Sequence, residues 1–376
     1  MKKIIVISGS TGGGHVSAAN SLQLYAEKMF NKKKLQVIHI DVIKHMSLFF
    51  KKVYADTYIN IIKFFPSIFG YLYKFTDHGK DKKVVLQEMR YHFEEFFSKR
   101  FKRVIKRIKP DYIIFTHFLP AEHLNKAALK KKYATKYAVV VTDFDVHSLW
   151  VQENMDLFFV ANEESALRLA NKGINKDKIH ITGIPIAPGF TDHYNKEEVK
   201  ARLGLSPKLD TVLLMTGAYG VGRIDSFTEH LFKNIDKEFQ VIALTGKNEK
   251  LSESLKKIEK KYPGRIKAVG FTNEVQKYMA ACEFAVTKTG GLTTSECLAM
   301  GLPIITLNPI PGQEEKNAYY LLENGAAFIT SDLIGLTYRF QKLLNNRELL
   351  VKMQKNALRL ATPKAGENIL NTVLGE

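Results

Sequence analysis

Short apolar runs separated by helical patterns organise the first half of the chain. Each run is bounded by polar or turn-forming residues, which is typical of strands that are buried on both faces of a parallel sheet. A helical pattern at about 16–30 follows the first run. Strands that alternate with helices favour a doubly wound α/β domain. The predicted strands are 4–7, 36–41, 112–115, 137–142, 157–160 and 180–182.

The second half repeats this pattern after a segment that is rich in proline and glycine, residues 183–189. Such a segment predicts a joint between two domains. We therefore expect two Rossmann-like domains, 1–186 and 187–350, which face each other across a cleft. A last helix in 351–376, at about 352–374, is expected to return to the first domain. The predicted strands of the second half are 211–215, 240–244, 266–269, 284–287 and 304–307.

The positive charge of the chain is concentrated in one region. The formal net charge is +18, and residues 44–109 hold sixteen basic and six acidic residues together with fifteen Phe or Tyr. Helical spacing of apolar residues predicts two amphipathic helices there, at 46–65 and 89–108. These faces either pack on the sheet or lie on an anionic lipid surface, where Phe64 and Phe65 would contact lipid. No nucleic-acid-binding module accompanies the charge.

Composition excludes several classes of protein. The two cysteines, Cys282 and Cys297, form neither a disulfide framework nor a zinc or redox motif, which favours a reducing compartment. The apolar run at the N-terminus is too short for a secretory signal, and no stretch approaches the ~20 apolar residues of a spanning helix. We therefore expect a cytoplasmic protein that binds the cytoplasmic face of the cell membrane peripherally.

A glycine loop at 8–14 joins the first predicted strand to the first predicted helix. Glycines let the backbone approach a ligand, and a helix N-terminus attracts anions. The loop lacks the Lys-Ser/Thr pair of a Walker A motif. It also fits the dinucleotide fingerprint poorly, although Asp41 ends the second strand as an NAD-ribose ligand would. His15 begins the helix, where its charged form is disfavoured. We expect a general base there, and a capping or structural histidine is the alternative.

A second candidate segment, 142–150, follows another predicted strand. Asp143-Phe144-Asp145 has the D-x-D spacing of a divalent-metal motif, but nothing else nearby resembles a metal site. We expect Asp143 and His147 to line the same cleft rim as His15, with the single tryptophan, Trp150, offering its amphipathic ring to an acceptor.

Four loops of the second half are placed to hold a nucleotide sugar at the carboxyl ends of strands. A tight turn is the alternative explanation for each loop alone, but the four occur together and in order. Glu296 lies two turns into a helix, where it can accept two ribose hydroxyls. The loops are 216–220 (a diphosphate cradle), 271–275 (a base edge), 289–296 (phosphate and ribose) and 311–317 (sugar hydroxyls).

These segments resemble the processive diacylglycerol glucosyltransferases and monogalactosyldiacylglycerol synthases, which belong to glycosyltransferase family 28. The similarity runs from about residue 4 to 360. Thr289 stands where bacterial relatives often have proline. The matching residues are Gly13-Gly14-His15, 141–144, His147, 149–151, 153–154, 181–186, 287–288, 290–293, Glu296, 301–303, 311–314 and Asn317.

The resemblance implies a GT-B fold and an inverting transfer of a hexose from a UDP-sugar to diacylglycerol, with no metal or other cofactor. It implies that His15 is the base and that Phe271 and Val275 hold the uracil. Asp143 is a second catalytic candidate because of its expected place on the cleft rim. The expected acceptor and lipid contacts are His147, Trp150, Phe64 and Phe65. The expected donor-binding residues are Gly14, Gly217, Ala218, Phe271, Val275, Thr289, Gly290, Gly291, Leu292, Thr293, Glu296, Gln313, Glu314 and Asn317.

Three other functions fit parts of the pattern. A lipid-I-type GlcNAc transferase and a UDP-GlcNAc 2-epimerase share the fold, but diffusible epimerase substrates give no reason for a basic, aromatic region. A non-catalytic UDP-sugar sensor at the membrane would not need a base in the cleft. The sequence leaves open whether the donor is UDP-glucose or UDP-galactose, how many sugars are added, the oligomeric state and the depth of membrane insertion.

Overall fold

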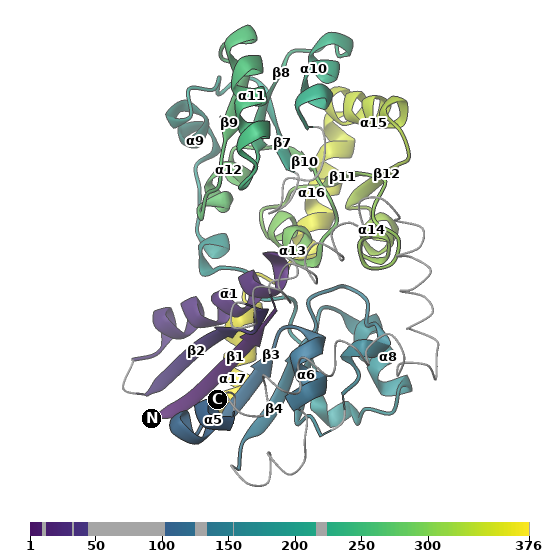
Figure 1. The fold of residues 1–376 in the computed structure, drawn as a ribbon. Coiled ribbons are helices and arrows are strands. Elements are labelled where there is room, and N and C mark those ends of the chain that lie inside the picture. Colours follow the sequence, from purple (N-terminus) through teal and green to yellow (C-terminus); the bar gives the residue numbers. More distant parts are fainter. Residues whose placement is uncertain are drawn as a thin grey trace. The chain divides into compact units, whose positions relative to one another are not determined.

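A computed structural model describes residues 1–9, 13–31, 34–43, 102–124, 134–152, 154–215 and 224–375. The chain forms two compact units, which are described separately (Figure 1). The first comprises residues 1–188, 310–313 and 364–376, and the second comprises 189–309 and 314–363.

The first unit is built on a parallel sheet of six strands in the order β2-β1-β3-β4-β5-β6. From β1 the chain adds β2 on one side, and it then crosses over to add β3 and the later strands on the other side. Doubly wound sheets bind ligands at such a switch point, which here lies between β1 and β3. The strands are β1 (Lys2–Ser8), β2 (Leu35–Asp41), β3 (Tyr112–Phe115), β4 (Lys136–Val140), β5 (Leu157–Val160) and β6 (Ile179–Ile181).

Helices bury both faces of this sheet, because alternate residues of each strand point to opposite sides. Ile4 and Val6 of β1 join the core under α1 and α17, whereas Ile5 and Ile7 join the core under α5, α6 and α8. The helices are α1 (Gly13–Met29), α5 (Lys102–Ile108), α6 (Phe118–Leu124), α8 (Glu163–Asn171) and α17 (Ala365–Leu374). Short 3-10 turns are η3 (Ser148–Trp150), η4 (Lys176–Lys178) and η5 (Pro188–Thr191).

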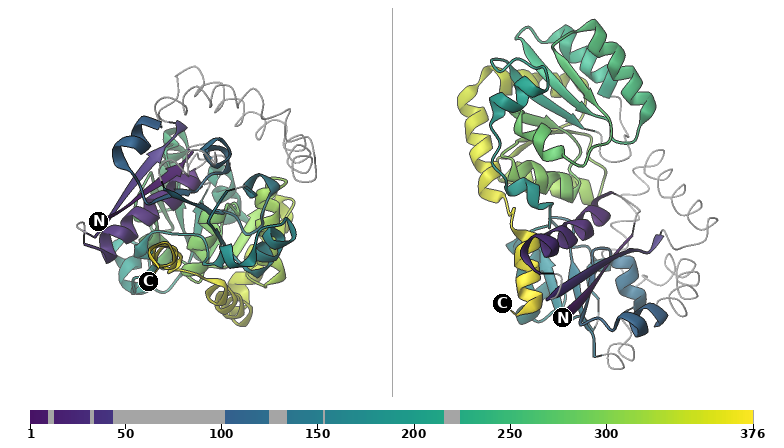
Figure 2. Two further views of the ribbon diagram at one scale, coloured as in Figure 1. Left: turned by 90° about the horizontal axis from the view of Figure 1, so that it is seen from below. Right: turned by 90° about the vertical axis from the view of Figure 1, so that its left-hand side faces the viewer.

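The single helix expected at about 352–374 is wrong. Two helices stand there, α16 (Arg347–Leu360) and α17, and residues 361–364 separate them. Pro363 lies in this break, where it has no N–H to continue a helical ladder. The second of the two helices, α17, packs against α1 in the first unit (Figure 2).

The second unit also contains a six-stranded parallel sheet, in the order β12-β11-β10-β7-β8-β9. The sequence predicted five of these strands and missed β12, a four-residue edge strand. The two doubly wound parallel sheets confirm the predicted fold class. The strands are β7 (Asp210–Met215), β8 (Phe239–Leu244), β9 (Ile266–Val269), β10 (Phe284–Val286), β11 (Ile304–Leu307) and β12 (Ala327–Thr330).

Side-chain caps begin several helices of this unit. Asn248 accepts the N–H of Leu251 at the start of α11, and Asp332 accepts the N–H of Gly335 at the start of α15. The buried faces of α10, α11, α15 and α16 form one core with the sheet. The helices are α9 (Lys196–Arg202), α10 (Ile224–Asn234), α11 (Glu249–Lys261), α12 (Val275–Ala280), α13 (Gly291–Ala299), α14 (Gln313–Glu323), α15 (Leu333–Asn345) and α16.

A buried ion pair joins α9 to Glu283, the residue that precedes β10. Lys200 Nζ lies 3.1 Å from Glu283 Oε1, and both side chains are almost fully buried. Glu283 also accepts the backbone N–H of Thr211 on β7, and Lys200 donates to the carbonyl of Leu209. Because both charges are paired and hydrogen-bonded, this buried pair is tolerated inside the unit.

Most of the basic, aromatic region at 44–109 lies outside the described residues. Of the two amphipathic helices predicted there, only the last turns of the second are described, as α5. Ile105 of α5 is buried in the core, and Val104 and Ile108 pack against the same core. None of the described helices has the length and apolar character needed to cross a membrane.

Candidate active site

His15 lies in the first turn of α1, the helix that follows β1 at the switch point of the first sheet. Its Nδ1 lies 2.8 Å from the carbonyl oxygen of Thr116 and 2.9 Å from Oγ1 of Thr142. A carbonyl can only accept, so Nδ1 carries the hydrogen of the neutral ring and Nε2 keeps the lone pair. Thr116 also returns a bond, from Oγ1 to the carbonyl of His15 at 2.9 Å. The ring is therefore fixed in the tautomer that a general base requires.

The imidazole of His15 is also kept neutral. Burial lowers its pKa from 6.5 to about 4, and the hydrogen bond to Thr116 opposes this shift only in part. At pH 7 the ring is therefore ready to accept a proton. Burial, rather than the helix N-terminus invoked from the sequence, is the main cause of the lowered pKa.

Sequence reasoning missed Thr116 and His117, which follow β3 at the switch point. The His117 ring lies edge-on to the His15 ring, with 4.5 Å between centroids, and stacks on Phe118 at 4.6 Å. Burial and the neighbouring His15 hold the pKa of His117 well below 6.5. A Cβ added at Gly9 would lie 3.3 Å from the His117 ring, so this glycine permits the close approach. The position of Thr116-His117 directly after a buried strand was the signal available.

A polar relay holds the strand that leads into the glycine loop. Ser8 Oγ, at the end of β1, lies 2.7 Å from Nε2 of His39 on β2. Nδ1 of His39 lies 2.8 Å from Oδ1 of Asn20 on α1. The relay therefore links the residue before the loop to the helix after it, and so helps to position His15.

Asp143 follows β4 and is buried. Its Oδ2 accepts a hydrogen bond of 2.6 Å from Nε2 of Gln313, which belongs to the first unit. The sequence assigned Asp143 to catalysis and Gln313 to the sugar hydroxyls, and the structure brings these two candidates together. Its neighbour Asp145 forms an ion pair with Arg168 at 2.8 Å.

The two described acceptor candidates, His147 and Trp150, are buried. Nδ1 of His147 accepts the N–H of Leu149 and so caps η3. Trp150 is 2% exposed and packs in the core, with its ring centroid 6.2 Å from that of His15. Trp150 therefore packs beside the candidate base, whereas His147 caps a turn, and contact of either residue with an acceptor stays a prediction.

In the second unit, the donor candidates gather around the start of α13. This helix follows β10, beside the switch point between β7 and β10, and Gly290 is its N-cap. The unpaired N–H groups of such a helix start are suited to phosphate oxygens. Leu292, Thr293 and Gly14 of the expected donor set all lie in first turns of helices, Gly14 in α1 of the other unit.

Hydrogen bonds join three more donor candidates to this helix start. Thr289 Oγ1 donates to the carbonyl of Glu314 at 2.6 Å, and Asn317 Nδ2 donates to the carbonyl of Thr289 at 2.9 Å. Asn317 is fully buried. The loop before α13 is thus fastened to the first turns of α14, and Gly290 and Gly291 are held in place.

Glu296 lies in the second turn of α13. Burial raises the pKa of its carboxyl from 4.5 to about 8. The carboxyl group of Glu296 is therefore largely protonated at neutral pH in this structure. Both its protonated and its ionised form can make hydrogen bonds with hydroxyl groups.

The two base-edge candidates have different surroundings. Phe271 is 59% exposed, and Nζ of Lys247 lies 5.2 Å from its ring centroid. Val275 begins α12. An exposed aromatic ring with a cation beside it is suited to stacking on a nucleobase.

Several predicted site residues lie outside the described residues. They include the middle of the glycine loop, residues of the 216–220 loop, which lies wholly outside the described residues, and the two lipid contacts. These residues are Ser10, Thr11, Gly12, Gly217, Ala218, Phe64 and Phe65.

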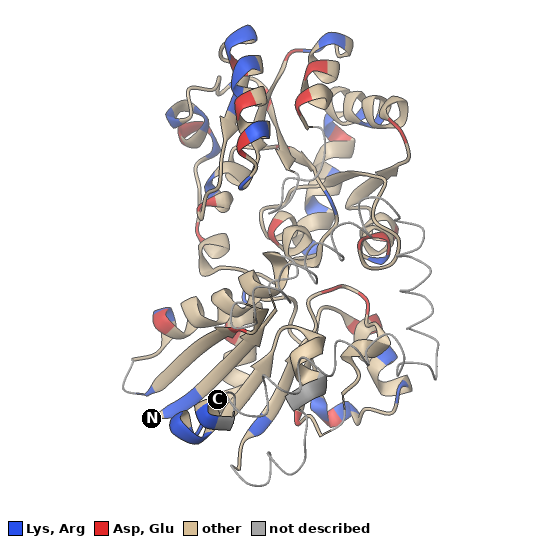
Figure 3. Cartoon of the chain, in the orientation of Figure 1, with Lys and Arg blue, Asp and Glu red and all other residues tan. Residues whose placement is uncertain are grey.

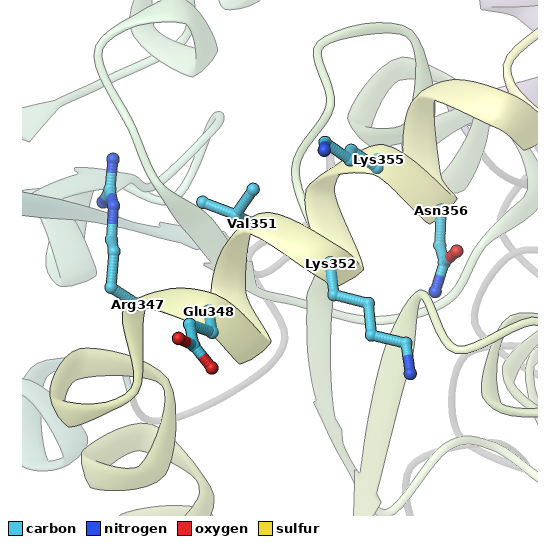
Figure 4. A pocket seen from close by; sticks show the side chains of 6 residues that line it. All are labelled: Arg347, Glu348, Val351, Lys352, Lys355 and Asn356. Carbon is cyan, nitrogen blue, oxygen red and sulfur yellow. The ribbon is translucent and has the colours of Figure 1, made fainter.

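A surface hollow of about 500 Å³ lies along α16 (Figure 4). Six side chains of this helix line it, and none was a predicted site residue. They are Arg347, Glu348, Val351, Lys352, Lys355 and Asn356. Among the residues that the structure describes, no group of three or more His, Cys, Asp or Glu side chains is arranged to hold a metal ion.

Comparison with known proteins identifies both halves of the chain. A family model described as monogalactosyldiacylglycerol (MGDG) synthase matches residues 15–186. A second, described as the glycosyltransferase family 28 C-terminal domain, matches residues 211–369. Processive diacylglycerol beta-glucosyltransferase of Bacillus pumilus (strain SAFR-032) is 29% identical over 379 residues, covering 99% of this chain and 94% of that protein. The protein of the same name from Bacillus subtilis (strain 168) is 29% identical over 376 residues, covering 100% and 95%.

Solved structures support the fold. Acinetobacter baumannii MurG has a TM-score of 0.64 at 13% identity and covers all of both chains. The S. aureus MnaA-UDP co-structure has a TM-score of 0.63 at 16% identity and covers 99% of this chain and 96% of that one. These likenesses show the GT-B type of fold. The two family models and the full-length relatives go further: the chain belongs to the family of processive diacylglycerol glucosyltransferases and monogalactosyldiacylglycerol synthases, within glycosyltransferase family 28.

Proposed function

We propose that this enzyme transfers a hexose from a UDP-sugar to the hydroxyl group of 1,2-diacylglycerol, with inversion at the anomeric carbon. The family supports the reaction class, and the names of the full-length relatives make glucose the first donor to test. The observation that carries the proposal is His15, a neutral imidazole whose Nδ1 is engaged and whose Nε2 keeps its lone pair.

The chemistry then follows from these residues. Nε2 of His15 takes the proton of the diacylglycerol hydroxyl as its oxygen attacks the anomeric carbon. The bond from that carbon to the UDP oxygen breaks on the opposite face, so the configuration inverts. The negative charge that develops on UDP is stabilised by backbone N–H groups at the start of α13. Catalysis requires that the anomeric carbon of the donor held there comes within reach of the hydroxyl oxygen whose proton His15 Nε2 accepts.

Metal independence is part of the proposal. Helix-terminal N–H groups take the role that a divalent cation has in other transferases. Asp143 and Asp145, the D-x-D pair, are instead engaged with Gln313 and Arg168. Wild-type turnover is expected to persist in EDTA, and loss of turnover that Mn²⁺ restores would make this pair a metal site.

We further propose that the enzyme acts at the cytoplasmic face of the membrane, held by anionic lipid. The formal net charge of +18, concentrated in residues 44–109, supports this placement. Attachment to a surface also suits an acceptor that does not leave the bilayer.

The decisive experiment replaces His15 by alanine. Purified wild type and His15→Ala are assayed for transfer from UDP-glucose and UDP-galactose to diacylglycerol in vesicles, read by thin-layer chromatography. We expect a loss of about 10²–10⁴-fold in kcat, because the proton acceptor is removed. The affinity for UDP is expected to change little, since the donor residues described above belong mainly to the second unit.

His193→Ala is the matched control, because this histidine is exposed and lies outside both clusters of site residues. It should keep wild-type turnover. If His15→Ala retains near wild-type kcat while chemistry is rate-limiting, the base is another residue, and Asp143 or His147 is tested next. If the wild type binds UDP-sugars and transfers to no lipid, the sensor function is favoured.

A further inference from the structure

Asp143 is a buried acid whose neighbours in the chain are anchored on both sides. Before it, Oγ1 of Thr142 lies 2.9 Å from Nδ1 of His15. After it, the carbonyl of Phe144 accepts a hydrogen bond of 2.8 Å from Nδ2 of Asn162. Asp143 itself is 6% exposed. Its carboxylate therefore has a fixed place next to a residue that contacts the candidate base.

The residue that follows Gln313 is fastened to the loop before α13. Gln313 is the first residue of α14, and the carbonyl of Glu314 accepts a hydrogen bond of 2.6 Å from Oγ1 of Thr289. One turn later, Asn317 donates to the carbonyl of Thr289 at 2.9 Å. Thr289 leads directly into Gly290, the N-cap of the helix proposed to stabilise the charge on UDP. The backbone at Gln313 is therefore held next in the chain to a residue that bonds to the donor loop.

The hydrogen bond between Gln313 and Asp143 determines which way the amide group is turned. Nε2 of Gln313 lies 2.6 Å from Oδ2 of Asp143. An ionised carboxylate can only accept a hydrogen bond, so the NH₂ group faces Asp143 and the carbonyl oxygen Oε1 faces away from it. Among the residues that the structure describes, none bonds to Oε1. Asp143 thus makes the far side of this amide an acceptor.

The proposed reaction indicates what this acceptor meets. The hexose of the donor is bonded to UDP, and its anomeric carbon is attacked by the hydroxyl oxygen whose proton His15 accepts. A residue that holds the hexose is therefore expected to be linked to both sets of groups. Gln313 meets this condition, because its side chain bonds to Asp143 and its neighbour Glu314 bonds to Thr289. Each hydroxyl group of a hexose can donate to such an oxygen.

We propose that Asp143 is a positioning residue for the donor sugar: it orients the Gln313 amide so that Oε1 accepts a hydrogen bond from a hydroxyl group of the hexose. In this role Asp143 touches neither the sugar nor the transferred proton. The inference rests on the proposed function, which identifies the ligand as a UDP-hexose. Its effect is on the affinity for the hexose part of the donor, because UDP alone has no sugar hydroxyl to offer Gln313.

Exchanging the two types of side chain tests this role. Asp143→Asn and Gln313→Glu each keep the shape of the side chain, and the double variant keeps the single negative charge of the pair. In the double variant, the amide introduced at position 143 can donate to the carboxylate introduced at position 313, whose second oxygen still accepts from the sugar. Isothermal titration calorimetry without diacylglycerol measures the dissociation constants for UDP-glucose, UDP-galactose and UDP.

The two single variants are expected to fail and the double variant to recover. Gln313→Glu sets two carboxylates against each other, so it should weaken binding of the preferred UDP-hexose at least about tenfold and binding of UDP less than about twofold. Asp143→Asn should weaken UDP-hexose binding several-fold, because an amide at position 143 can donate or accept and no longer fixes the orientation of Gln313. The double variant should return to within about threefold of wild type, since the two changes are coupled.

Asp177→Asn combined with Gln341→Glu is the matched control, because both residues are exposed and lie outside both clusters of site residues. It makes the same two chemical changes and should bind all three ligands as wild type does. Melting temperatures check that every variant is folded.

Three results would overturn the proposal. In the first, wild type binds UDP and neither UDP-hexose, or Asp143→Asn binds UDP-hexose as wild type does. In the second, the double variant binds UDP-hexose no better than Gln313→Glu alone. In the third, each single variant loses as much affinity for UDP as for UDP-hexose, which would show that the pair has only a structural role. Because these measurements require no transfer, a failure of the proposed function, in which bound donor gives no glycolipid, is seen separately by thin-layer chromatography.

Discussion

At the scale of single residues, the base candidate depends on partners that are distant in sequence. Thr116 and Thr142 lie 101 and 127 positions from His15, yet both contact the same nitrogen of its ring. The carbonyl of Thr116 selects the tautomer, and burial keeps the ring neutral. The first contact leaves Nε2 as the ring nitrogen that can take a proton, and the second keeps the ring unprotonated over the whole neutral pH range.

Glu296 gives a pH prediction for donor binding. Burial raises its pKa to about 8, so about a tenth of the free enzyme is ionised at pH 7 and about nine tenths at pH 9. If ribose hydroxyls bind the ionised carboxylate more tightly, UDP affinity should rise as the pH is raised, by up to about tenfold between pH 7 and 9. Isothermal titration calorimetry in two buffers of different ionisation enthalpy measures both the affinity and the proton released.

Glu296→Gln is the control for this measurement, because it keeps the shape and cannot ionise. Its UDP affinity should be weaker than that of wild type at pH 9 and should not rise with pH. Parallel pH profiles for the two proteins would mean that Glu296 does not bind the ribose.

The sequence predicted some of these residues and not others, for a physical reason. His15, Gly290 and Glu296 belong to local patterns in which a glycine loop or turn is followed by a helix. Such a pattern can be recognised from a few neighbouring residues. Thr116 and His117 have no such pattern, and their importance comes from β3 lying beside β1 in the sheet. The burial that sets the pKa of His15 is likewise a property of the folded unit.

At the scale of elements, the apolar runs predicted strands well because parallel strands are buried on both faces. Phe115, for example, is fully buried at the end of a strand whose bounds match the prediction. The missed strand β12 is short, and its middle residues, Phe328 and Ile329, are only partly buried at the sheet edge. The break between α16 and α17 was missed because the apolar spacing continues past Pro363.

Packing between α17 and α1 gives a stability prediction. A methyl group added at Gly366 would overlap the ring of Tyr25, so Gly366→Ala should lower the free energy of unfolding by about 1–3 kcal/mol. Urea unfolding measures the change. Gly270→Ala is the control, because an added Cβ there meets nothing within 4 Å.

A double-mutant cycle assigns the effect to this contact. Tyr25→Leu removes the ring, so adding Gly366→Ala in that background should cost clearly less than in wild type. Equal costs in the two backgrounds would show that Gly366 is needed for its backbone conformation instead of for close packing.

At the scale of the whole molecule, fold and chemistry come from separate parts of the sequence. The two sheets establish where switch points lie, and the loops after β1, β3 and β10 supply the candidate base and donor residues. Similar folds in MurG and MnaA carry other names, so the fold alone does not give the acceptor. Full-length similarity to diacylglycerol glucosyltransferases does favour a lipid.

The concentrated charge of residues 44–109 then predicts how the enzyme reaches that lipid. Neutralising Lys51, Lys52, Lys63 and Lys74 together to Gln should weaken binding to vesicles that contain anionic lipid, since each basic residue near such a surface contributes about 1 kcal/mol. Vesicle co-sedimentation measures the binding. Raising the salt concentration should weaken wild-type binding in the same way, because the attraction is screened beyond about 8–10 Å at physiological ionic strength.

A control separates this regional effect from a loss of net charge. Replacing Lys250, Lys256, Lys257 and Lys260 by Gln removes the same charge from α11, whose exposed side carries lysines and glutamates together (Figure 3). Vesicle binding by this variant should stay close to that of wild type, and UDP binding should be unchanged in both variants. Equal losses in the two variants would mean that total charge, rather than the region 44–109, attracts the enzyme to the membrane, because a diffuse field of +18 acts without a defined contact surface.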